Sequence, residues 1–149
     1  MKKIGFNILV NCIIPILCGT LIYVGYRPTS LNYFSWFSEL GLANNLLVVR
    51  KNISSLWPKP ANWIVYSLPD GLWAYSFIFS IKLIWNEKQG GYWIWTFISY
   101  MIILLPEILQ FNKILPGTYD IQDIALLLLG IILSSIVLST KKYEYEKTI

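Results

Sequence analysis

The chain has 149 residues, of which 56% are hydrophobic and 16% aromatic, while only 13% are charged. Ordinary soluble domains carry roughly 25% charged residues, so this chain cannot cover a water-facing surface, and lipid must be the solvent for much of it. The net charge of +4 does not indicate nucleic-acid binding, because the basic residues lie at the chain ends and between apolar runs.

The chain contains no histidine, which excludes the usual zinc and haem sites and any Ser-His or Cys-His catalysis. Its two cysteines, Cys12 and Cys18, both lie in the first apolar run. On a helix they would face different sides and could not pair with each other. We interpret both as small, buried apolar side chains.

The first apolar run covers residues 4–26 and follows two lysines. A positive start before an apolar stretch also describes a signal peptide. However, the run is long enough to cross a hydrocarbon core of about 30 Å, and no small-x-small cleavage site follows it. We therefore predict an uncleaved transmembrane helix, with a kink at Pro15 and Gly19.

The apolar runs within residues 30–57 are too short to cross a membrane, yet the segment is too apolar to be exposed to water. Ser30 is a plausible N-cap for a helix over Leu31–Leu40, where apolar residues recur at helical spacing. A second short helix is predicted through Leu46–Arg50. This segment is typical of amphipathic helices that lie on the membrane surface, and an aromatic lid over a substrate is the alternative.

Three further spans are predicted, at residues 63–85, 92–111 and 121–140. Pro69 can break or start the helix within the first of these, and Lys82 near its end can extend to the headgroups. The polar stretch Asn86–Gly91 and the Pro116–Gly117 turn would join the spans as antiparallel neighbours. The short charged tail after residue 140 needs no fold. The predicted fold is therefore an all-α bundle of four transmembrane helices forming one membrane domain, with an interfacial helix between spans one and two.

The distribution of lysine and arginine favours both termini inside the cell. The inner side would then hold Lys2, Lys3, Lys82, Lys88, Lys141, Lys142 and Lys147. The outer side would hold Arg27, Arg50, Lys51, Lys59 and Lys113.

A set of acidic and amide residues lies toward one face of this four-span arrangement, namely Asp70, Glu107, Gln110, Asp120 and Asp123. Ionisable groups at membrane depth are costly and normally face the bundle interior, a polar cavity or a partner. Four acids together would repel one another unless cations or protons intervene, and Arg27 and Lys113 are the available counter-ions. We predict a polar pocket at the outer face and an inner half that is inert apolar anchoring.

Each acid also has a structural interpretation. Asp120 and Asp123 suit the first turn of a helix, where the helix dipole favours negative charge, and Asp70 follows a proline at a helix start. Glu107 is the hardest to explain in this way, because it lies one to two turns inside an apolar span.

The segment from Glu107 to Asp123, together with Gly130, resembles the signature of VanZ-like membrane proteins. That family has a Glu-x-x-Gln pair ending one span and an Asp-x-x-Asp pair opening the next, which correspond here to Glu107 with Gln110 and Asp120 with Asp123. The chain departs from the pattern at Thr118, where the family commonly has arginine, and at Leu127, where it has asparagine. Of the family's upstream Asp-Lys…His element, only Asp70 is present.

The resemblance implies a protein of the bacterial plasma membrane with a role in the cell envelope, where the family is associated with low-level glycopeptide resistance. The polar pocket would bind a lipid headgroup or a cell-wall precursor, and a bridging divalent cation is compatible with its oxygen ligands. Neither a resident cofactor nor a structural metal is expected, and no catalytic residue is assigned.

Two other functions stay open. In the first, the acids only join helices in an assembly subunit through interhelical hydrogen bonds. In the second, the chain is an enzyme acting on a lipid-linked substrate, with Glu107 as a base and Asp120 or Asp123 holding a metal ion.

Overall fold

The computed structural model describes residues 2–58, 60–85, 90–115 and 119–146, and these residues form helices joined by turns, without a strand. The all-α prediction is therefore confirmed. In chain order the elements are α1 (Lys2–Ile8), the π-helix η1 (Leu9–Ile13), α2 (Ile14–Tyr26), α3 (Asn32–Glu39), α4 (Ala43–Leu56), α5 (Asn62–Tyr66), α6 (Leu68–Ile84), α7 (Tyr92–Phe111) and α8 (Ile121–Glu146).

Within the described residues, three helical segments are long and apolar enough to cross a membrane. They are Gly5–Tyr26, which joins α1, η1 and α2, then Tyr92–Phe111 and Ile121–Ser139. Their lengths of 22, 20 and 19 residues match the roughly 20 residues that a helix needs to cross a bilayer. These segments support a membrane protein.

The second predicted span differs from the prediction, because residues 63–85 do not form one helix. Helix α5 ends at Tyr66, and α6 begins at Leu68 and has 17 residues. In a continuous helix the Pro69 ring would collide with the carbonyl group of Val65, and its nitrogen could not donate a hydrogen bond. The chain therefore turns at Ser67, and α6 is too short to be recognised as a span from length and composition alone.

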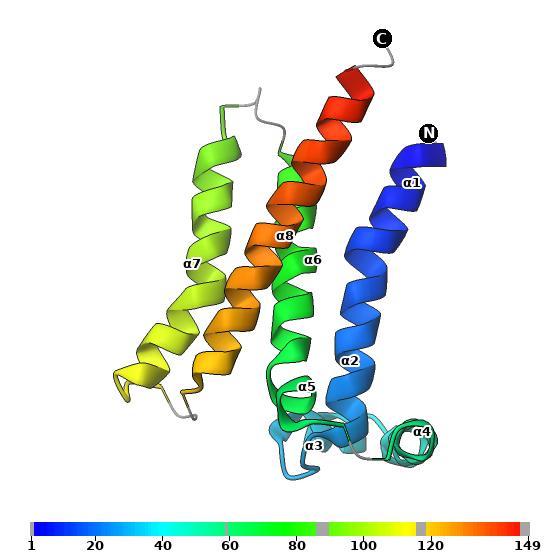
Figure 1. Ribbon diagram of the computed structural model, residues 1–149. Coiled ribbons are helices and arrows are strands. Elements are labelled where there is room, and N and C mark those ends of the chain that lie inside the picture. Colours follow the sequence, from blue (N-terminus) through cyan, green and yellow to red (C-terminus); the bar gives the residue numbers. More distant parts are fainter. Residues whose placement is uncertain (1, 59, 86–89, 116–118, 147–149) are drawn as a thin grey trace.

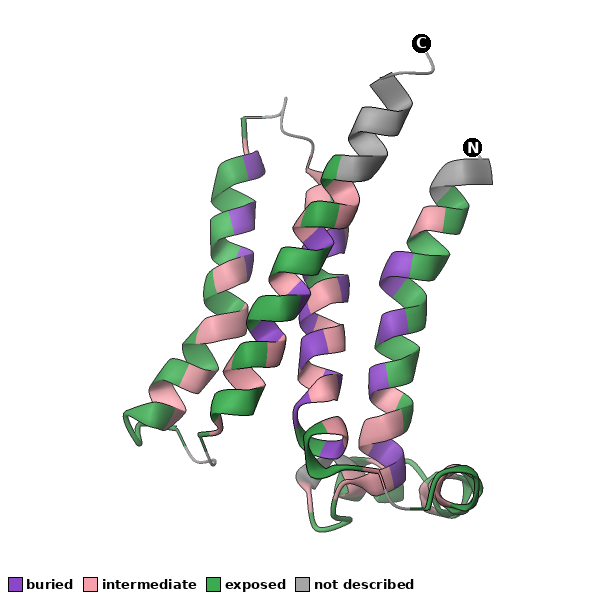
Figure 2. Ribbon diagram, in the orientation of Figure 1, coloured by how far each residue is buried: buried purple, intermediate pink, exposed green. Residues whose placement is uncertain are grey.

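Helix α6 nevertheless lies at the centre of the bundle, where it packs against α2, α7 and α8 (Figures 1 and 2). Its side chains include the most deeply buried ones among the described residues, such as Ile78 and Phe79, both 0% exposed. Small residues permit the close approach of its neighbours. A Cβ atom on Gly19 of α2 would lie 2.7 Å from Nε1 of Trp73 on α6.

The first span contains a local widening just before Pro15, one of the two positions at which a kink was predicted. Residues Leu9–Ile13 form a π-helix, in which the N–H of Ile14 donates to the carbonyl of Leu9, five residues earlier. This widening directly precedes Pro15, whose ring excludes the ordinary α-helical hydrogen bond to the preceding turn. Cys12 in the π-helix is buried as predicted, but Cys18 is exposed on the outward side of α2, so the prediction for Cys18 was wrong.

Helices α3 and α4 lie across the end of α2, with α4 seen end-on in Figure 1. The predicted Ser30 cap is wrong. Ser30 belongs to a turn in which the N–H of Leu31 donates to the carbonyl of Pro28, so α3 starts later, with Leu31 at the N-cap position. Helix α4 is longer than predicted because no proline or glycine interrupts it before Pro58.

Helix α8 also extends beyond its predicted end, since it continues to Glu146 through residues that were expected to have no fold. Neither proline nor glycine occurs in this stretch to stop the helix. The predicted Pro116–Gly117 turn and most of the Asn86–Gly91 connection lie outside the described residues.

Candidate functional site: the acidic end of the bundle

The five predicted site residues lie at one end of the bundle, which we call the acidic end: Asp70, Glu107, Gln110, Asp120 and Asp123. Helices α6 and α8 begin at this end and α7 finishes there, because successive long helices run in opposite directions (Figure 1). Asp70 and Asp123 lie in the first turns of α6 and α8. The positive ends of these two helix dipoles favour the negative charges of Asp70 and Asp123, whereas Glu107 lies near the negative end of α7.

Arg27 extends from the end of α2 to Asp70, with 3.8 Å between its Nη2 atom and Oδ2 of the carboxylate. The same nitrogen donates a 2.6 Å hydrogen bond to the carbonyl of Tyr66. The guanidinium also lies 4.8 Å from the ring centre of Tyr66 and 5.3 Å from that of Tyr23. These contacts hold Arg27 between aromatic rings, where a planar cation is favoured.

Glu107 on α7 and Asp123 on α8 are both half-buried. One carboxylate oxygen of each, Oε2 and Oδ1 respectively, is shielded from solvent and has no hydrogen-bond partner among the described residues. Both groups lie within electrostatic range of each other and of Asp70. A shielded carboxylate without a donor is costly, so a proton, a cation, or a donor from water or another bound molecule would stabilise this pair.

Asp120 has a different environment, because its Oδ1 atom accepts a 2.9 Å hydrogen bond from the backbone N–H of Gln122. This is the usual contact of an N-cap residue, and it satisfies one free donor at the start of α8. Gln110 is half-buried on α7, one turn after Glu107. The structure thus gives Asp120 a capping contact, while the unsatisfied acceptors belong to Glu107 and Asp123.

Lys113 is exposed and has a left-handed backbone, with φ of 57°. It ends α7 in a Schellman motif, in which its N–H donates to the carbonyl of Gln110 and the N–H of Ile114 donates to that of Leu109. Helix α3 ends with the same two bonds around Gly41, whose φ is 72°. Lys113 therefore occupies a position that normally favours glycine.

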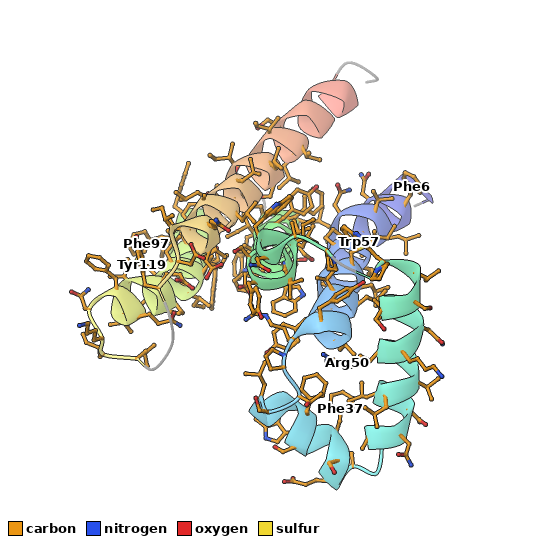
Figure 3. All side chains as sticks on the ribbon, turned by 60° about the horizontal axis from the view of Figure 1, so that its bottom comes forward. Phe6, Phe37, Arg50, Trp57, Phe97 and Tyr119 are labelled. Atoms are coloured by element: carbon orange, nitrogen blue, oxygen red, sulfur yellow. The ribbon has the colours of Figure 1, made fainter. Side chains whose placement is uncertain are left out.

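No sequence pattern indicated that Arg50 and Tyr26 would join the surface helices to the bundle. Arg50 of α4 donates to the carbonyls of Val24 and Arg27, at 3.2 Å and 2.6 Å, and so satisfies acceptors at the end of α2 (Figure 3). The hydroxyl of Tyr26 donates to the carbonyl of Trp57 after α4. These contacts place α4 at the same end of the bundle but on the side of α2, away from α7 and α8 (Figure 3), and none of its side chains is buried.

Ser67 was also given no role by the sequence. Its side chain is completely buried at the turn before α6, and its hydroxyl has no hydrogen-bond partner among the described residues.

The other half of the bundle is not purely apolar, because polar side chains also join helices there. Asn11 in the π-helix accepts a 2.7 Å hydrogen bond from the hydroxyl of Tyr75 on α6. Lys82 does not extend away from the bundle, because its Nζ atom donates a 2.7 Å hydrogen bond to Ser135 of α8. An asparagine within an apolar run was the available signal for the first of these contacts.

No group of three or more acidic or cysteine side chains among the described residues is placed to hold a metal ion. Gly117 and Thr118, which belong to the VanZ-like motif, lie outside the described residues. No protein-family model matches the chain, and neither a curated protein nor a solved structure gives a significant match.

Proposed function

We propose that this chain is a VanZ-like protein of the bacterial plasma membrane whose acidic end binds the amine of a lipid headgroup or cell-wall precursor at the outer face. One observation carries the proposal. Glu107 and Asp123 each have a shielded carboxylate oxygen without a donor among the described residues. Arg27, a nearby cation, contacts Asp70 and Tyr66 through its Nη2 atom, while its buried Nε atom has no hydrogen-bond partner among the described residues.

The chemistry of these groups favours an ammonium ligand. An ammonium ion has three donors and a positive charge, and it would satisfy both shielded oxygens while reducing the repulsion among the acids. Charge-assisted hydrogen bonds of this kind are roughly twice as strong as neutral ones. The amide of Gln110, one turn from Glu107, would be available to a hydroxyl or phosphate of the same ligand.

The topology that we propose has four spans, with α6 as the second and both termini in the cytoplasm. The 17 residues of α6 correspond to about 25 Å, near the lower limit for a spanning helix. Its position among three apolar helices supports a membrane location. The excess of lysine on the side of the termini supports the orientation.

Helices α3 and α4 would lie in the outer interface. Their exposed side chains include large apolar groups such as Trp36, Leu47, Val48 and Leu56, which is 86% exposed. Such a surface is costly in water but suits the boundary between headgroups and acyl chains. In this proposal the two helices would lie at the same membrane face as the acidic end, on the side of α2.

Ligand binding can be tested with phosphoethanolamine and purified protein in lipid nanodiscs. Glu107→Gln and Asp123→Asn should each weaken binding about tenfold, equivalent to about 1.4 kcal/mol. Glu39→Gln removes an exposed acid on α3 and serves as the control that keeps binding unchanged. Binding by both variants at the wild-type level would contradict the proposal.

The same variants distinguish a ligand site from an assembly subunit whose acids join helices. A ligand site predicts that their melting temperatures in detergent stay equal to or above the wild-type value, because removing shielded charges relieves repulsion. A packing role predicts a lower melting temperature and an altered oligomer size. Phosphoethanolamine binding would then fall only in proportion to the loss of folded protein.

The topology has its own test, in which single cysteines are introduced into a chain that lacks Cys12 and Cys18. Glu39→Cys and Lys113→Cys should react with a membrane-impermeant maleimide from outside intact cells. Gly90→Cys should react only after the cells are opened. Labelling of Glu39→Cys and Gly90→Cys from the same side would exclude α6 as a span.

A further inference from the structure

A groove with an estimated volume of 350 Å³ lies between α2, α6 and α8. Its walls are formed by Pro15 of α2, by α6 residues from Leu68 to Tyr75, and by α8 residues from Leu126 to Val137. Nearly all the lining surface is apolar. The hydroxyl of Tyr75 donates to Asn11 and is therefore already satisfied, so the groove suits an apolar occupant.

The groove is open along its side. Leu129 and Leu133, on its α8 wall, are 46% and 43% exposed. Both residues belong to the segment Ile121–Ser139, which is long and apolar enough to cross a membrane. In the proposed topology, the opening would therefore face acyl chains.

The dimensions of the groove correspond to one lipid chain. From Leu126 to Val137 the α8 wall extends about 16 Å at 1.5 Å per residue. Half of a hydrocarbon core of about 30 Å is similar in length.

The charge at one end of the groove indicates which lipid would bind. Leu126 follows Asp123 by one helical turn, and Oδ1 of Asp123 has no hydrogen-bond partner among the described residues. Arg27 engages Asp70 at the same end of the bundle. A chain lying in the groove would thus place its headgroup beside an acid that lacks a donor, which is complementary to an amine.

We infer that the ligand of the acidic end is an amine-headed lipid, with an acyl chain in the groove between α2, α6 and α8 and its ammonium group at Asp123 and Glu107. This inference rests on the proposed function and adds the chain-binding part of the site. It predicts that headgroup recognition and chain recognition are separable, since they depend on different residues.

The test uses purified protein in dodecyl maltoside and native mass spectrometry with dioleoyl phosphatidylethanolamine. Dioleoyl phosphatidylglycerol supplies the same chains without the amine, and phosphoethanolamine supplies the amine without the chains. Leu133→Trp fills the groove. Ile132→Trp is its control, because Ile132 is a neighbour on α8 with 53% exposure and does not line the groove.

Leu133→Trp should weaken phosphatidylethanolamine binding about tenfold and leave phosphoethanolamine binding unchanged, while Ile132→Trp binds both as the wild type does. Asp123→Asn should remove the preference for phosphatidylethanolamine over phosphatidylglycerol. If Leu133→Trp does not fold, as judged by circular dichroism, Leu129→Trp takes its place, with Leu128→Trp as control.

Two results would overturn the inference in different ways. Wild-type phosphatidylethanolamine binding by the groove-filling variant excludes the groove, and the proposed amine site survives if phosphoethanolamine binding still depends on Asp123. In the second result, Leu133→Trp weakens the binding of both phospholipids equally, and Asp123→Asn changes the binding of neither phospholipid nor of phosphoethanolamine. This result would show that the groove holds an acyl chain without selecting the headgroup. That second result overturns the proposed function as well.

Discussion

Gly71 of α6 and Gly130 of α8 meet at a point where the two helix backbones touch. A Cβ atom on Gly130 would collide with the carbonyl oxygen of Gly71 and lie 3.0 Å from the backbone nitrogen of Tyr75. A Cβ atom on Gly71 would lie 2.9 Å from the carbonyl oxygen of Leu126. Because lipid gives no hydrophobic drive for helix association, such close contacts between small residues are a main source of helix packing in membranes.

Gly130→Ala should therefore lower the melting temperature in detergent and reduce stability by about 1–3 kcal/mol, since backbone atoms cannot move aside as a flexible side chain can. Gly5→Ala is the matched control, because a Cβ atom there meets nothing within 4 Å. Alanine is also the better helix former, so the control should be neutral or slightly stabilising. Equal melting temperatures for the two variants would contradict the close crossing.

The two Schellman motifs predict that introducing glycine at Lys113 and removing it at Gly41 have opposite effects on stability. Lys113→Gly should stabilise the protein by about 1 kcal/mol, because glycine adopts a left-handed backbone without the cost that a Cβ atom adds. Gly41→Ala should destabilise it by a similar amount. Chemical denaturation in mixed micelles measures both, and a loss of stability in Lys113→Gly would show that the lysine side chain contributes more than its backbone strain costs.

Removal of the Arg27 side chain should lower the free energy of unfolding by more than the ion pair with Asp70 contributes. Their side chains are 21% and 31% exposed at a separation of 3.8 Å, and such partly exposed pairs contribute below about 1 kcal/mol. Arg27→Met also loses the hydrogen bond to Tyr66 and contacts with two rings. A double-mutant cycle with Asp70→Asn should give a coupling energy smaller than the total loss in Arg27→Met. If the coupling energy accounts for the whole loss, the ring contacts contribute nothing.

The hydrogen bond between Tyr75 and Asn11 should stabilise the contact of α6 with the π-helix by about 0.6 kcal/mol, the average for such bonds in membranes. Tyr75→Phe removes the hydroxyl and keeps the ring. Tyr66→Phe is the control, because the Tyr66 hydroxyl makes no hydrogen bond among the described residues. In thermal unfolding experiments in detergent, Tyr75→Phe should therefore lower the melting temperature, whereas Tyr66→Phe should not.

Much of the candidate site could be predicted from the sequence because the membrane restricts the possible arrangements. The Pro106-Glu107 step near the end of α7 and Asp123 at the start of α8 had to lie at the same end once consecutive helices were antiparallel. Their side-chain environments could not be predicted in this way. Asp120 caps its helix, whereas Asp123, three residues later, has a shielded oxygen, and this difference depends on how α7 and α8 pack.

The break before α6 shows where local information was incomplete. Pro69 indicated that the helix could be interrupted. The resulting helix has 17 residues, too few to identify it as a membrane span from its length. Its burial at the centre of the bundle depends on Gly19, Gly71 and Gly130, which are distant from one another in the sequence.

The helical class, the long apolar segments and the end of the bundle at which the acids lie could all be predicted from the sequence alone. These features follow from local properties. Each helix satisfies its own backbone hydrogen-bonding groups, and the length of its apolar run indicates whether lipid or water surrounds it. Which helices touch, how Arg27 and Arg50 are bound and where a groove remains open depend on how the helices pack in three dimensions. Such contacts join residues far apart in the chain, as in the hydrogen bond between Tyr75 and Asn11 across 64 positions, and neither residue's local pattern specifies its partner.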